Sequence, residues 1–211
     1  MSETTNPAAN RLGAAPPGNR AFALPNLLTY LRIAAVPVVA ACLFAVSLYG
    51  FGFWLRWVAL FVFIAAALTD LLDGWAARTY GEQSSLGRML DPIADKLLVG
   101  ATLLFLAFDD TIRGWSMWAA FIILCREILV SGMREYLAEL HVSVPVSRLA
   151  KWKTVLQNVA VGFLVAGPAG DQVLPGATLT GISLLWIAAV LTIYTGFDYF
   201  RAGLRHFVDE R

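Results

Sequence analysis

Long apolar runs, separated by short polar or turn-forming stretches, dominate the chain. Six of these runs approach the roughly 20 residues that a helix needs to cross the apolar core of a bilayer. They cover residues 27–49, 52–78, 90–108, 114–138, 149–167 and 179–203. The connections are short, and one of them is the stretch 166–176, which contains Pro and Gly. The pattern predicts an all-α integral membrane protein built as a bundle of six transmembrane helices.

The first residues differ from the rest of the chain. Residues 1–23 contain Pro, Gly, Asn, Ser and Thr and hold no long apolar run. Such a segment cannot bury enough apolar surface to order itself. We therefore expect a disordered cytoplasmic tail at 1–23, one six-helix domain at 24–207 and a short C-terminal tail at 208–211.

Composition supports the membrane interpretation and excludes several other classes. Of the 211 residues, 58% are hydrophobic and 15% are charged, whereas an average soluble domain is about 25% charged. The net charge of +1 and the lack of a separate basic region argue against nucleic-acid binding. Cys42 and Cys125 lie in apolar runs far apart in sequence, which argues against a disulfide or zinc framework.

The basic residues predict the orientation in the membrane. One side of the bundle carries, in helix ends and loops, Arg11, Arg20, Arg32, Arg78, Arg88, Lys96, Arg134, Arg148, Lys151, Lys153, Arg201, Arg205 and Arg211. The other side carries only Arg56 and Arg113. Because cytoplasmic loops carry the excess of Lys and Arg, we expect a protein of the inner, cytoplasmic membrane with both termini and the active site cytoplasmic.

Four aspartates stand out near the second and third apolar runs. Asp70 and Asp73 lie at the cytoplasmic end of the second run, and Asp91 and Asp95 begin the third. Residues three or four apart share one face of a helix, so each pair projects together, and a short connection brings the pairs close. Four unpaired anions at a membrane boundary repel one another and resist desolvation. The spacing therefore predicts a site that holds cations.

Two divalent cations would neutralise four carboxylates. Oxygen ligands suit Mg²⁺ or Mn²⁺, and a metal pair held by carboxylates is suited to in-line displacement at phosphorus. Gly74 and Ala77 leave the adjacent helix face bare, so that a base or a diphosphate can approach the backbone. Arg78 supplies a guanidinium fork for phosphate.

Two other interpretations of the aspartates remain open at this point. They could pair with Arg78, Arg88 and Lys96 at a water-exposed boundary, or form the ion path of a cation or proton transporter. A transporter places acids near the bilayer midplane, often between two related halves. Here the acids lie at one end and no internal repeat is detected. A non-enzymatic scaffold has no need of the four acids.

The complete motif resembles that of a known family. It consists of Asp70, Asp73, Gly74, Ala77, Arg78, Gly87, Asp91 and Asp95 in fixed order and spacing. This pattern is similar to the signature of the CDP-alcohol phosphatidyltransferases. The resemblance implies a six-helix membrane enzyme, usually a homodimer, that moves a phosphatidyl group from CDP-diacylglycerol to an alcohol and releases CMP.

The resemblance also implies roles for individual residues. Two Mg²⁺ ions would be held by Asp70, Asp73, Asp91 and Asp95. Asp95 would in addition be the catalytic base, a choice among the acids that spacing alone leaves open. Asp70, Asp73, Gly74, Ala77, Arg78 and Gly87 would line the cytidine diphosphate site. We expect the lipid donor to enter through a lateral opening between helices.

Basic residues inside or beside the helices bear on the acceptor alcohol. Arg126 lies near the middle of the fourth run, Arg134 follows eight residues later, and Lys151 and Lys153 begin the fifth run. A cation inside a membrane is unfavourable unless an anion meets it. The cluster therefore predicts an acceptor that carries its own phosphate, such as glycerol 3-phosphate.

Each of these cations also has a simpler interpretation. Lys151 and Lys153 lie about 200° apart on a regular helix, so both face one pocket only if the helix start is irregular. Either lysine, like Arg134, can simply mark the cytoplasmic boundary. Arg126 can instead pair with Asp198 or with one of the four motif acids.

Further resemblance favours the branch of the family that uses glycerol 3-phosphate. The similar segments are residues 25–32, 126–128, 131–135, 146–147 and 151–154, together with Gln157. They imply additional substrate contacts at Asn26, Thr29 and Arg32. The alternatives within the same chemistry are inositol phosphate, inositol or phosphatidylglycerol as acceptor.

Overall fold

The computed structural model describes residues 24–50, 52–80, 85–140 and 148–209. Within these ranges the chain forms six helices and no strand. They are α1 (Leu24–Tyr49), α2 (Trp54–Tyr80), α3 (Ser85–Phe108), α4 (Ser116–Glu139), α5 (Arg148–Val173) and α6 (Ala177–Asp209). The all-α prediction is confirmed for the described residues, while the predicted tail at 1–23 lies outside them and α6 continues through Asp209.

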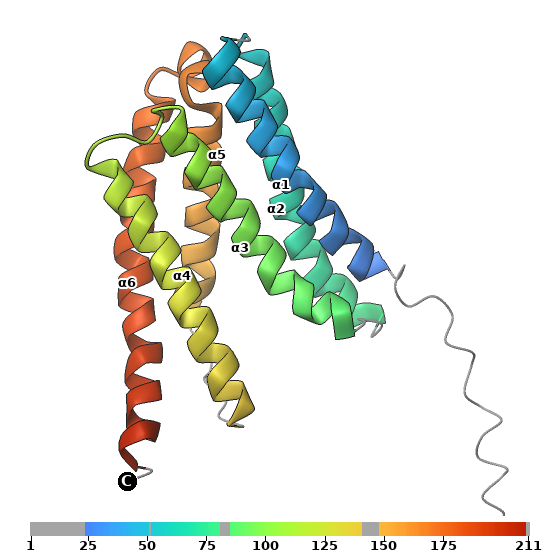
Figure 1. The fold of residues 1–211 in the computed structure, drawn as a ribbon, viewed down its shortest axis with the longest axis vertical. Helices are drawn as coiled ribbons and strands as arrows, with labels where there is room; N and C mark the ends of the chain where they lie inside the picture. The colour runs from blue at the N-terminus through green and yellow to red at the C-terminus, as the bar shows by residue number, and fades with distance from the viewer. Residues whose placement is uncertain (1–23, 51, 81–84, 141–147, 210–211) are drawn as a thin grey trace, which may run out of the picture.

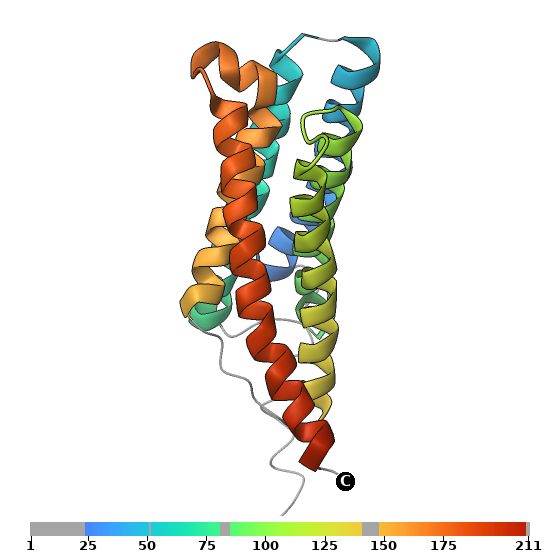
Figure 2. The ribbon, with the colours of Figure 1, turned by 90° about the vertical axis from the view of Figure 1, so that its left-hand side faces the viewer.

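Successive helices run in opposite directions. Helices α1, α3 and α5 begin at the lower end of Figure 1, and α2, α4 and α6 end there. Helix α1 packs along α2 and α3, and α5 packs along α6 and α2. Figure 2 shows α6 between α5 and α4, and both neighbours contact it. The bundle therefore places both pairs of motif aspartates at its lower end.

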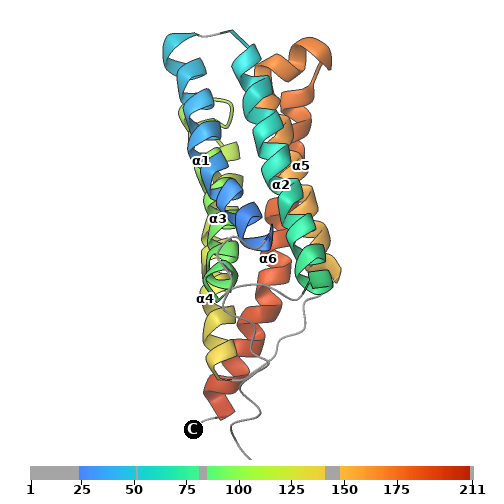
Figure 3. The same ribbon diagram turned by 90° about the vertical axis from the view of Figure 1, so that its right-hand side faces the viewer.

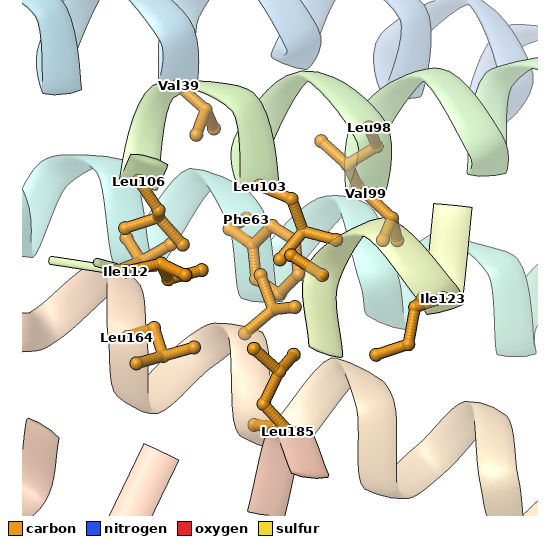
Figure 4. Close-up of a cluster of buried hydrophobic side chains, with 14 of the residues drawn as sticks. Val39, Phe63, Leu98, Val99, Leu103, Leu106, Ile112, Ile123, Leu164 and Leu185 are labelled. Carbon is orange, nitrogen blue, oxygen red and sulfur yellow. The ribbon is translucent and has the colours of Figure 1, made fainter. Parts of the chain in front are cut away.

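The core runs through the middle of the bundle, and every helix contributes to it. Figure 4 shows Val39, Phe63, Leu103, Ile123 and Leu185 converging from five of the helices. Many large apolar side chains face outward instead, as 40 of the described ones are at least one-third exposed. An apolar exterior of this extent is typical of a surface that contacts lipid or another protein.

Three helices in the described part of the chain are long and apolar enough to cross a membrane. These candidate spans are Asn26–Tyr49, Ser116–Glu139 and Ala177–Phe197. Within α2, the apolar stretch Trp54–Thr69 is shorter. The finding supports a membrane protein and three of the predicted spans, whereas spans by α2, α3 and α5 stay predictions.

The structure differs from the sequence prediction at the end of α5. The Pro- and Gly-containing stretch 166–176 was expected to be a connection, but helical structure continues to Val173 across a kink at Gly167. Gly167 has φ 45° and ψ −130°, a conformation that glycine adopts without a steric penalty. Pro168 then starts a new helical turn, where its missing N–H is no loss. Proline therefore marks a kink here, not the end of the helix.

A buried ion pair fixes the upper end of the bundle. Arg56 of α2 is paired with Asp109, and their side chains are 4% and 2% exposed. Its guanidinium also donates to Thr111 Oγ1 at 3.0 Å and to the Val165 carbonyl at 3.3 Å. A Cβ at residue 167 would lie 2.5 Å from Arg56 Nη1, so glycine leaves the space for the guanidinium. Arg56 thus joins α2, the α3–α4 connection and α5.

We expect Arg56→Met to destabilise the protein by about 3 kcal/mol, because it leaves the Asp109 carboxylate buried without its partner. Thermal unfolding of the detergent-purified variant should show a lower midpoint than the wild type. Arg113→Met is the matched control, since Arg113 is exposed in the same region. Equal midpoints for the two variants would show that the buried pair contributes little.

Candidate functional site

The motif residues lie where α2 ends and α3 begins. Asp70, Asp73, Gly74, Ala77 and Arg78 are in the last turns of α2, but their side chains lie outside the described part of the structure. In α3, Gly87 is buried, and Asp91 and Asp95 are half-buried one turn apart. The backbone therefore brings the motif to one end of the bundle. It leaves the arrangement of the four carboxylates as a prediction.

Helix α1 supplies the polar groups that hold Asp91. Arg32 Nη1 donates to Asp91 Oδ1 at 3.1 Å, and Thr29 Oγ1 donates to the same oxygen at 3.3 Å. Asn26, Thr29 and Arg32 are each 0% exposed, so the three positions that the resemblance singled out face the interior together. The ion pair orients the Asp91 carboxylate, whose side chain remains 25% exposed.

This environment fits a hard divalent cation. Both described hydrogen bonds to Asp91 end on Oδ1. The other carboxylate oxygen, Oδ2, could therefore serve as a metal ligand. Carboxylate oxygens are the donors that Mg²⁺ prefers. Among the residues whose side chains are described, no three His, Cys, Asp or Glu side chains form a metal-binding group. A site with three such ligands therefore needs at least one side chain outside the described ones, and the motif predicts Asp70 and Asp73 for this role.

A second polar cluster joins α4, α5 and α6. Arg126 Nε donates to the Thr192 carbonyl at 3.0 Å, and Arg126 Nη2 donates to Thr195 Oγ1 at 3.0 Å. Its Nη1 also lies 3.4 Å from Glu127 Oε1, and Lys153 of α5 forms an ion pair with the same oxygen. The predicted cations Arg126 and Lys153 are thus brought together around one carboxylate.

The two clusters are electrostatically connected. Lys153 interacts with the Asp95 carboxylate as well as with Arg126 and Glu127. The Lys153 side chain is 4% exposed, which places its charge inside the bundle, and α5 packs against α3, the helix that carries Asp95.

The other two predicted cations are placed less closely. Arg134 is exposed on α4, two turns beyond Arg126 toward the lower end. Lys151 belongs to α5, and its side chain lies outside the described residues. Because residues 151 and 153 are both helical, the two positions are about 200° apart around the axis. The described contacts of Arg126 go to Thr192, Thr195 and Glu127, while the alternative partner Asp198 has no described side chain.

Sequence reasoning assigned no role to several residues of the second cluster. Glu127 is the shared partner of two cations, and Ser131 accepts a hydrogen bond from Lys96 of α3. Gln157 is 4% exposed, and its Oε1 has no hydrogen-bond partner among the described residues. The sequence did contain one signal for this role of Glu127, namely an acid directly after Arg126 within an apolar run. Its partner could not be found without the register between α4 and α5.

An apolar groove runs between α2 and α5, which lie side by side in Figure 3. Its volume is about 470 Å³. It is lined by Leu68 and Thr154 near the motif and by Trp57 and Val173 toward the upper end. Residues 57 and 68 are about 16 Å apart along α2 at 1.5 Å per residue. The groove therefore leads from the motif along the outside of the bundle.

The combination of helical bundle, terminal aspartate motif and buried cations is that of a membrane phosphotransfer enzyme. Residues 22–194 match the family model for CDP-alcohol phosphatidyltransferase. The chain belongs to this family and is one of its enzymes. The predicted family is confirmed.

Curated relatives extend the comparison over most of the chain. A CDP-diacylglycerol--glycerol-3-phosphate 3-phosphatidyltransferase of Rickettsia bellii is 45% identical, over 87% of this chain and 97% of the relative. A protein of the same name from Cereibacter sphaeroides is 37% identical, and so is one from Arabidopsis thaliana whose name carries the number 2. The match to the Cereibacter protein covers 90% of this chain and 99% of that relative. The match to the Arabidopsis protein covers 87% of this chain and 80% of that relative.

Replacing Arg32 tests whether the α1 contacts matter for the site. We expect Arg32→Met to lower the rate of CMP release by about 10- to 100-fold, as loss of a group that orients a ligand commonly does. Arg32→Lys keeps the charge and should retain more activity than the methionine variant. A wild-type rate in Arg32→Met would contradict a role in orienting Asp91.

Proposed function

We propose that this enzyme transfers the phosphatidyl group of CDP-diacylglycerol to sn-glycerol 3-phosphate. The products are phosphatidylglycerophosphate and CMP, a step of phospholipid biosynthesis. The observation that carries the acceptor assignment is the buried Arg126 and Lys153 pair beside the aspartate motif. The names of relatives up to 45% identical support the same reaction.

In this proposal the motif aspartates hold two Mg²⁺ ions, and Mn²⁺ could replace them. Asp70, Asp73, Asp91 and Asp95 are the ligands, and their all-oxygen donor set fits these cations. The bound ions would supply Lewis-acid stabilisation of the diphosphate. Arg32 and Thr29 of α1 hold the Asp91 carboxylate in place through their hydrogen bonds to Oδ1.

The chain's own residues then bind and activate the substrates. Gly74, Ala77, Arg78 and Gly87 receive the cytidine diphosphate together with Asp70 and Asp73. Asp95 accepts the proton of the acceptor hydroxyl. At the same time the hydroxyl oxygen forms a bond to the β-phosphorus of the donor. The bond between that phosphorus and the bridging oxygen breaks, and CMP leaves with the electron pair.

The acceptor phosphate is bound by Lys153 and Arg126, with Arg134 and Lys151 as further basic positions nearby. The electrostatic attraction between Lys153 and Asp95 supports a phosphate position on the same side of the bundle as the base. Inositol is disfavoured as acceptor because it has no phosphate group. Phosphatidylglycerol is disfavoured because its phosphate is the diester that joins its glycerol to the lipid. Inositol phosphate shares the required group, so it is the acceptor that most needs testing. Thr29 and Arg32 act through Asp91 in this arrangement, and Asn26 keeps the substrate contact that the resemblance implies.

All six helices cross the bilayer in this proposal. Five of them have at least 24 residues and α5 has 19 before its kink at Gly167, lengths that reach or come close to the roughly 20 needed for a span. Helices α2, α3 and α5 also pack against the apolar candidates. The lower end of the bundle is cytoplasmic, as the excess of basic residues there indicates. One acyl chain of the donor lies in the groove between α2 and α5, and the enzyme works as a homodimer.

The decisive assay is CMP release by purified protein with CDP-diacylglycerol, Mg²⁺ and one added acceptor at a time. We expect release with glycerol 3-phosphate, and little with inositol, inositol phosphate, serine or phosphatidylglycerol. EDTA should abolish the release, and Asp95→Asn should reduce it by about 100-fold or more, as loss of a general base does.

The outcomes of this assay separate the alternatives. Activity with another acceptor would retain the family chemistry and overturn the assignment of Arg126 and Lys153. Full activity in EDTA would contradict the metal proposal. Ion movement in liposomes without CMP release would favour the transporter.

Filling the groove tests the position of the lipid donor. Val159→Trp places an indole in the lining, and we expect it to raise KM for CDP-diacylglycerol several-fold while leaving KM for glycerol 3-phosphate unchanged. Val190→Trp is the matched control, because Val190 is 62% exposed on α6 and outside the groove lining. Equal effects of the two substitutions would place the acyl chain elsewhere.

A further inference from the structure

Glu127 contacts two of the predicted phosphate-binding cations, Arg126 and Lys153. Its Oε1 pairs with Lys153 of α5 and lies 3.4 Å from Arg126 Nη1 of α4. The reaction proposed above gives this carboxylate no chemical step. Its side chain is 23% exposed, whereas those of Arg126 and Lys153 are 13% and 4% exposed. The carboxylate therefore lies at the more open edge of the cluster.

The charges explain why an acid is needed there. Arg126 and Lys153 carry like charges and interact with each other, so without an anion they repel in a region with little water. An isolated buried ammonium is also strongly unfavourable. One carboxylate shared by both cations offsets these effects and leaves the cluster with a net charge of +1, which can still attract a phosphate.

Arg126 and Lys153 are held in place by different contacts. Arg126 is also held from α6, by the Thr192 carbonyl and by Thr195 Oγ1. The Lys153 ammonium is at the end of a flexible chain, and Glu127 fixes it next to Arg126. The position of the Lys153 charge thus depends on Glu127 more than that of the Arg126 charge does.

We propose that Glu127 is a positioning residue for the acceptor: its carboxylate holds the Lys153 ammonium beside Arg126, so that both cations are arranged for the phosphate of the incoming alcohol before it binds. This inference rests on the proposed function. It adds a negatively charged residue to the recognition of a negatively charged substrate.

The test is steady-state CMP release by Glu127→Gln, which keeps the size of the side chain and removes its charge. We expect KM for glycerol 3-phosphate to rise about tenfold, which corresponds to about 1.4 kcal/mol. The values of kcat and of KM for CDP-diacylglycerol should stay close to those of the wild type. Glu127→Asp should restore part of the affinity. Glu139→Gln removes an exposed acid from the same helix and should leave all three values unchanged.

Several results would overturn the inference. These are an unchanged or lowered KM for glycerol 3-phosphate, or an equal loss in all kinetic values together with a lower unfolding temperature. If Glu127→Gln does not fold, Glu127→Asp is judged by the same criteria, because it keeps the negative charge that the two buried cations need and moves that charge away from Lys153. CMP release by the wild-type protein with glycerol 3-phosphate tests the proposed function separately. The ratio of KM for glycerol 3-phosphate in the variant to that in the wild type tests the role of Glu127.

Discussion

The charged groups inside this bundle can be buried only in combination, and this constraint shapes both of its ends. At the upper end Arg56 is paired with Asp109 and held by Thr111 and the α5 backbone. At the lower end Arg32 is paired with Asp91. A single unpaired charge at any of these positions would destabilise the fold by several kcal/mol.

The two ends satisfy the constraint differently, and the difference supports the proposed site at the lower end. The upper cluster is closed, because both charged side chains are almost fully buried. At the lower end Asp91 and Glu127 remain 25% and 23% exposed beside their buried cationic partners. Charges that are partnered yet accessible can still engage a metal ion or a phosphate. The apolar groove between α2 and α5 reaches the same end, which gives a lipid donor a route to it.

The sequence predicted the helices and the motif well, because apolar runs and helical spacing are local properties. It missed the continuation of α5 past Gly167, where proline follows a kink without ending the helix. It also could not predict that Lys153 meets Glu127, since this contact depends on the register between α4 and α5. The pairing of Arg32 with Asp91 likewise depends on how α1 packs against α3. Long-range pairs of this kind follow from packing, which the spacing of residues along one helix does not determine.

The central claim is that donor and acceptor phosphates meet between the aspartate motif and the cations of α4 and α5. It is tested most directly by an experimental structure of the full-length protein with Mn²⁺, CDP-diacylglycerol and glycerol 3-phosphate, using anomalous scattering to locate the metal. We expect two Mn²⁺ ions about 4 Å apart, bound by Asp70, Asp73, Asp91 and Asp95, with the acceptor phosphate against Lys153 and Arg126. Metal bound away from these aspartates, or an acceptor phosphate distant from both cations, would contradict the claim.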